Sequence, residues 1–75
     1  MITVLVVDDH ELVRTGICRM LEDHPDVEVI GQAESGEEAI ALVRQKSPQV
    51  VLLDVNMPGI GGVETTRRLS QIASE

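Results

Sequence analysis

Short runs of branched aliphatic residues alternate along the chain with segments whose apolar positions recur at helical spacing. The first run, Ile2–Val7, is almost continuously apolar, which is typical of a strand buried on both faces. A second run, Val27–Ala33, is interrupted by Glu28 and Gln32, so it favours a strand at the edge of a sheet. A third run, Val50–Leu53, predicts another buried strand.

The segment Leu12–Asp23 changes period and predicts a helix that ends before Pro25. Its apolar residues recur at helical spacing on one face, which we expect to be buried: Val13, Ile17, Met20 and Leu21. Cys18 lies beside this face, and we expect it to act as a small packing residue.

Two further helices are predicted after the second and third strands. Ser35 is the expected N-cap of the first of these, and Glu38 completes the sequence signature of a capping box. This helix ends before Pro48, and its buried face is formed by Ala39, Ile40 and Val43. A loop at Met57–Gly62 then precedes a third helix over Val63–Ala73.

The predicted order is therefore β-α-β-α-β-α, which belongs to the α/β class and implies a parallel sheet with right-handed crossovers. A chain of 75 residues has room for one domain at most. A chain of this length has a small core. Because it contains no Phe, Tyr or Trp, that core must be built from branched aliphatic residues and Met.

The charge balance excludes several function classes. Thirteen acidic residues against six basic ones give a net charge of −7, so we expect no direct contact between this chain and nucleic acid. No apolar run is long enough to span a membrane or to form a signal peptide. The single cysteine, Cys18, cannot form a disulfide within the chain, which fits a reducing, cytoplasmic setting.

Acidic residues directly follow two of the predicted strands. Asp8 and Asp9 come after the first strand, and Asp54 comes after the third. The carboxyl ends of parallel strands meet at one edge of the sheet, so these carboxylates converge if the two strands are neighbours. Like charges in one crevice repel unless a cation intervenes, and Mg²⁺ is the hard cation that suits carboxylate oxygens and water.

His10 directly follows the two aspartates and leaves two interpretations open. It could contribute to a transition-metal site, or it could be a loop histidine that faces solvent. We favour the second interpretation, because no other ligand lies at helical or hairpin spacing from it.

Two segments, Val6–Arg14 and Leu53–Gly62, resemble the receiver domains of two-component response regulators, within the NarL/FixJ-type subgroup. The resemblance extends over the whole chain. It implies a flavodoxin-like (CheY-like) doubly wound parallel sheet, in which the three strands present here have the order 2-1-3.

The resemblance also implies a role for each matching residue. Asp54 matches the phosphoacceptor, which takes a phosphoryl group from a sensor histidine kinase or its phosphotransfer domain. Asp9 matches a direct Mg²⁺ ligand, and Asp8 matches an acidic partner that acts through water. Asp54 would complete the metal site together with the backbone carbonyl of Asn56.

The chain also departs from the family pattern, because receiver domains have five βα units and only three are predicted here. We therefore expect residues 1–75 to be the N-terminal part of a receiver domain, without an output domain. The resemblance implies that the full-length protein regulates transcription through a C-terminal helix-turn-helix domain. Without the later strands, Val50–Leu53 would be an exposed apolar edge, so we expect self-association there and little ability to switch.

Two other functions remain open. The chain could be a structural or competitor module that self-associates or pairs with intact receiver domains. It could also be a small Mg²⁺-dependent phosphatase with Asp54 as the nucleophile. The phosphatase would need a general acid two residues after the nucleophile, where this sequence has Asn56, which cannot donate a proton in that role.

Overall fold

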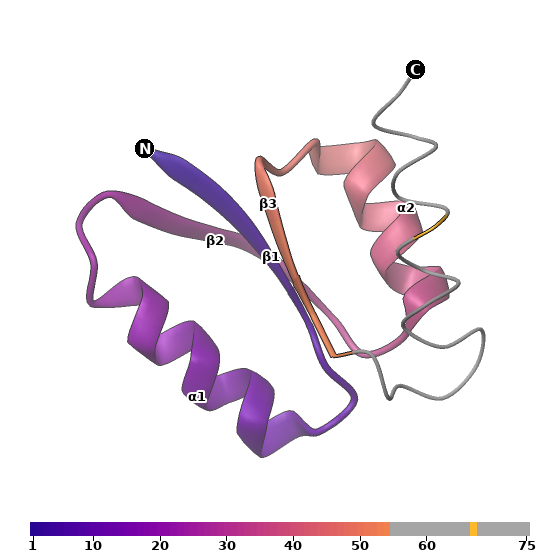
Figure 1. Ribbon diagram of the computed structural model, residues 1–75, viewed down its shortest axis with the longest axis horizontal. Helices are drawn as coiled ribbons and strands as arrows, with labels where there is room; N and C mark the ends of the chain where they lie inside the picture. The colour runs from indigo at the N-terminus through magenta and orange to yellow at the C-terminus, as the bar shows by residue number, and fades with distance from the viewer. Residues whose placement is uncertain (55–66, 68–75) are drawn as a thin grey trace.

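The computed structural model describes residues 1–54 and Arg67. Three strands and two helices alternate in this range (Figure 1), in the order β1 (Ile2–Val7), α1 (Glu11–Glu22), β2 (Val27–Ala33), α2 (Gly36–Lys46) and β3 (Val50–Leu53). The bounds of all three predicted strands are confirmed, whereas α1 begins and ends one residue earlier than predicted. The predicted loop at Met57–Gly62 and the predicted helix at Val63–Ala73 lie outside the described residues.

The strands form a parallel sheet in the order β2-β1-β3, so β1 is central and β2 lies at an edge. This arrangement confirms the predicted fold class and strand order. The helices lie on opposite sides of the sheet, as Figure 1 shows. Val4 and Val6 of β1 pack with Cys18 on the α1 side, whereas Leu5 and Val7 pack on the α2 side. The side chains of β1 therefore form the centre of both core layers.

A bulge in β2 changes which of its side chains face each helix. Val4 pairs with Val29, but Leu5 pairs with Gly31, so Ile30 is an extra residue in the ladder. Val29 consequently packs in the α1 layer, whereas Ala33 packs in the α2 layer. Regular alternation would place these two residues on the same face.

The face of α1 that contacts the sheet differs from the predicted one. Ile17 and Leu21 pack against the core as expected, but Val13 and Met20 are exposed. The buried residue of the helix is Cys18, so α1 is turned toward the Cys18 side of the predicted face. Helical periodicity thus identified Ile17 and Leu21 at the centre of the apolar face, but it did not determine which of the residues beside them contact the sheet.

Cys18 occupies the packing position expected for it. Its thiol is buried among β1 and β2 side chains, and it is not part of a disulfide. Burial raises the pKa of this thiol, and the nearby Glu22 carboxylate raises it further. The raised pKa keeps the sulfur protonated at neutral pH, which is consistent with a structural role rather than a reactive one.

Local capping defines both ends of α2. Oγ of Ser35 accepts a hydrogen bond of 3.2 Å from the backbone N–H of Glu38, which confirms the predicted N-cap. At the other end Ser47 takes a left-handed conformation with φ of 47°, and its N–H donates to the carbonyl of Val43. Neither helix within residues 1–54 is long and apolar enough to cross a membrane.

Replacing Leu5 with Ala should remove much of the stability of the fold. Leu5 is 1% exposed, so its truncation leaves a cavity in the α2 layer and should cost about 2–5 kcal/mol. The matched control is Leu12→Ala, because Leu12 is 89% exposed and should change stability by less than about 0.5 kcal/mol. Urea unfolding followed by far-ultraviolet circular dichroism measures both changes, and equal losses would contradict the assigned core.

Candidate functional site

The register between β1 and β3 brings the ends of these strands to the same level. Val7 is the partner of Leu53, so Asp8 and Asp54 follow the last paired residues on neighbouring strands. The backbone N–H of Asp54 donates to the carbonyl of Val7 at 3.1 Å, which extends the ladder to the site itself. The expectation that the first and third strands are neighbours is confirmed.

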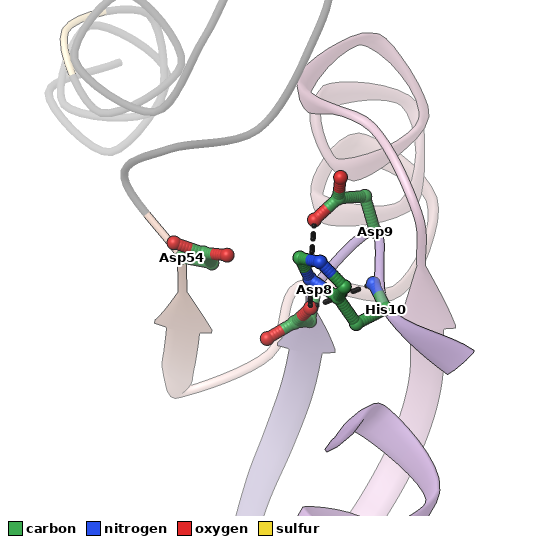
Figure 2. Close-up of side chains that lie close together, drawn as sticks. All are labelled: Asp8, Asp9, His10 and Asp54. Atoms are coloured by element: carbon green, nitrogen blue, oxygen red, sulfur yellow. Dashed lines mark hydrogen bonds and ion pairs between the residues drawn. The ribbon is translucent and has the colours of Figure 1, made fainter. Parts of the chain in front are cut away.

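Four side chains gather at this edge of the sheet (Figure 2). Asp8, Asp9, His10 and Asp54 each place one potential ligand atom within 4.8 Å of the others. Asp8 is the most deeply placed of them, with 7% of its surface exposed, and Asp54 is partly buried. The three predicted carboxylates are therefore brought together. Asn56, the fourth predicted metal-binding residue, lies outside the described residues.

His10 faces solvent as predicted, but it does not lie apart from the acidic residues. Its side chain is 68% exposed, and its Nδ1 atom is 3.0 Å from Oδ1 of Asp9 and 3.3 Å from Oδ1 of Asp8. Its backbone N–H also donates to Oδ1 of Asp8 at 2.8 Å. The prediction rested on the lack of a ligand at helical or hairpin spacing, and these ring contacts concern the two aspartates directly before it, because the turn after β1 folds the ring back over them.

Arg14 ties the loop that carries the aspartates to the rest of the domain. Its Nη1 donates to the backbone carbonyl of Asp8 at 2.7 Å, and its Nε donates to Oε1 of Gln32 at 3.1 Å. Sequence reasoning missed this role. The bulge in β2 places Gln32 opposite Val6, on the α1 side of the sheet, where Arg14 can reach it.

An apolar cleft lies directly below the carboxylates, between α1 and the β1–β3 pair. It has a volume of about 360 Å³ and is lined by Val6, Val7, Asp8, Ile17, Leu52, Leu53 and Asp54. The two acidic residues lie at one end of this lining, after the strands that form its floor.

The charges and donor atoms at this edge fit a hard divalent cation. Three carboxylates lie close together, and oxygen ligands of this kind are preferred by Mg²⁺. Oδ1 of Asp9 is inaccessible to solvent and accepts no hydrogen bond from the described part of the chain. Its contact with Nδ1 of His10 neutralises its charge only when the ring is protonated, and a bound cation would neutralise it otherwise.

Comparison with known proteins gives one consistent answer. The family model for the response regulator receiver domain matches residues 4–75. The response regulator GacA of Pseudomonas protegens is 65% identical over 69 residues, which cover 92% of this chain and 32% of that protein. The response regulator UvrY of Escherichia coli K12 is 51% identical over 75 residues, which cover 100% of this chain and 34% of that protein. The chain thus spans about one third of the length of these curated relatives.

Solved structures agree with the sequence relatives. A two-component response regulator of the LuxR family from Aurantimonas sp. SI85-9A1 has a TM-score of 0.91 and 38% identity, covering 96% of this chain and 51% of that one. The response regulator domain of Thermotoga maritima CheB has a TM-score of 0.92 and 32% identity, covering 95% and 53% of the respective chains. Both are similar to this chain in fold and in sequence.

Replacing Asp9 with Asn should stabilise the metal-free chain and make it insensitive to Mg²⁺. The substitution removes one of the crowded negative charges, so we expect a gain of about 1–2 kcal/mol in EDTA. The wild-type chain should instead gain stability as Mg²⁺ is added. Urea unfolding with and without Mg²⁺ measures both effects. The control is Asp26→Asn, which makes the same substitution at an exposed position. A loss of stability in Asp9→Asn would contradict the charge argument.

Proposed function

This chain belongs to the family of response regulator receiver domains, and we propose that it accepts a phosphoryl group on Asp54 from a sensor histidine kinase or its phosphotransfer domain. The observation that carries the proposal is the convergence of Asp8, Asp9 and Asp54 at one end of the sheet, produced by the β1–β3 register. A single carboxylate after a strand is common, whereas three within reach of one cation form an arrangement suited to phosphoryl transfer.

In the proposed reaction a carboxylate oxygen of Asp54 attacks the phosphorus of a phosphohistidine. The new O–P bond forms as the N–P bond breaks, and the electron pair of that bond stays on the donor imidazole. Asp54 is positioned for this by the hydrogen bond from its N–H to Val7 at the end of β3. Both reactants are anionic, so the reaction depends on charge neutralisation and alignment.

The residues that would hold Mg²⁺ are Asp9 and Asp54 directly, Asp8 through water, and the backbone carbonyl of Asn56. When bound, the cation would supply the neutralising charge for the carboxylates and the phosphoryl oxygens. The support for this set is the buried Oδ1 of Asp9 and the closeness of the carboxylates. Arg14 contributes by holding the carbonyl of Asp8, which keeps the loop in place.

The proposed chemistry is a single transfer to the protein rather than repeated turnover, so we do not class the chain as an enzyme. A phosphatase with Asp54 as its nucleophile would need a proton donor two residues further on, where Asn56 stands. The whole protein, by its likeness to GacA and UvrY, would act in the cytoplasm as a regulator of transcription. DNA would then be bound by a helix-turn-helix domain in the longer protein, because this chain carries a net charge of −7.

A small phosphodonor should test the proposal directly. Incubation with acetyl phosphate and Mg²⁺ should add one phosphoryl group to the folded chain, and EDTA should prevent the addition. Asp54→Asn should abolish the adduct, whereas the matched control Asp26→Asn should retain it. Intact-mass spectrometry detects the adduct, and circular dichroism verifies folding. A folded wild-type chain that gains no phosphoryl group under these conditions would contradict the proposal.

A second candidate function is that of an interaction module that self-associates or pairs with intact receiver domains. The observation in its favour is the outer edge of the sheet, because β3 pairs with β1 alone among the strands of residues 1–54. Val50 and Leu52 of this strand are both exposed. An exposed apolar strand with free backbone groups recruits other chains.

Sedimentation velocity should detect association through the β3 edge. The wild-type chain should form dimers or larger species as its concentration rises, and Leu52→Lys should reduce this association because a charge on an edge strand opposes pairing. The control is Leu12→Lys, which makes the same substitution at an exposed leucine that belongs to α1 rather than to β3. A monomer at all concentrations, or equal effects of the two substitutions, would argue against the interaction module.

A further inference from the structure

The imidazole of His10 lies over the carboxylate pair in a position that the proposed reaction does not use. His10 is the N-cap residue of α1, yet its side chain makes no capping hydrogen bond with that helix. The ring instead turns toward Asp8 and Asp9, as Figure 2 shows. One of its ring nitrogens is among the four potential ligand atoms that lie within 4.8 Å of one another.

The distance from Nδ1 to Oδ1 of Asp9, a direct ligand in the proposed function, matches the distance between neighbouring ligands of one cation. Two ligands at right angles around an octahedral ion, each about 2.1 Å from it, are about 3 Å apart. Nδ1 is 3.0 Å from Oδ1 of Asp9 and 3.3 Å from Oδ1 of Asp8.

The short contact between Nδ1 and Oδ1 of Asp9 is an ion pair only when the ring is protonated. Oδ1 of Asp9 accepts no hydrogen bond from the residues that the structure describes. In the neutral tautomer that carries its proton on Nε2, Nδ1 has a lone pair that can bind a cation beside this oxygen.

From this geometry we propose that Nδ1 of His10 is a cation ligand and that it shifts the preference of the site from Mg²⁺ toward divalent transition-metal ions. Imidazole suits ions such as Co²⁺, Ni²⁺ and Zn²⁺, whereas Mg²⁺ prefers oxygen ligands and retains its waters. The exposed ring can turn into solvent when Mg²⁺ binds, and it remains as a ligand for a transition-metal ion. This inference rests on the cation site of the proposed function, but phosphoryl capture by Asp54 does not depend on it.

Isothermal titration calorimetry with Mg²⁺ and with Co²⁺ tests the role of His10. His10→Ala should weaken Co²⁺ binding on the order of 10-fold or more and leave Mg²⁺ binding unchanged or tighter. The matched control is His24→Ala, which removes the other exposed histidine and should change neither affinity. Because a site with oxygen ligands alone also favours Co²⁺ over Mg²⁺, the decisive quantity is the change in the ratio of the two affinities.

Proton nuclear magnetic resonance of the Co²⁺-loaded wild-type chain provides a test that needs no variant. A Co²⁺-bound imidazole should show ring-proton resonances that are strongly shifted by the paramagnetic ion, and these should be absent from His10→Ala and retained in His24→Ala. The inference is overturned if His10→Ala leaves the affinity ratio and these resonances unchanged, or if the wild-type chain binds neither ion. Retention of the phosphoryl adduct in His10→Ala would show that the proposed function stands whatever the outcome for His10.

Discussion

The parallel pairing of β1 with β3 is the constraint on which the rest of the site depends. The backbone ladder ends with Val7 opposite Leu53, so the next residue on each strand carries a carboxylate to the same place. A shift of one residue would move every side chain of β3 to the opposite face of the sheet. Such a shift is opposed by the core itself, because alternate residues of β1 are buried under different helices. The position of the acidic residues is thus determined by apolar packing that lies outside the site.

This packing holds like charges closer together than they would lie in an unfolded chain. The contact that Arg14 makes with the loop does not neutralise the carboxylate of Asp8. Arg14 donates to the backbone carbonyl of Asp8 rather than to its carboxylate, and the nearest cationic group in this loop, His10, is charged only when protonated. The fold therefore defines the shape of the loop with a backbone contact, which leaves the neutralisation of Asp8 and Asp9 to the cation of the proposed function.

Much of this arrangement could be predicted from the sequence, because its main signals are local. Continuous apolar runs gave the correct bounds of the strands, and Ser35 correctly marked the start of α2. The features that could not be predicted depend on contacts distant in sequence. The extra residue in β2 is visible only in its pairing with β1, and it is what places Gln32 within reach of Arg14. The exposure of Val13 similarly depends on how α1 rotates over the sheet, which periodicity alone does not specify.

The residues of the site differ in whether they follow a strand or lie in a loop, and this difference bears on which cation the site can accept. Asp8 and Asp54 follow directly from paired strands, so the backbone that carries their carboxylates is fixed by the sheet. His10 extends from a turn into solvent, and its ring can rotate without disturbing a strand or a core contact. Carboxylates on a fixed backbone, combined with the movable ring nitrogen of His10, can adapt to ions that differ in ligand preference. Asp54 follows a paired strand and His10 belongs to the loop, so on the proposed roles a change at His10 should alter selectivity and leave the proposed phosphoacceptor, Asp54, in place.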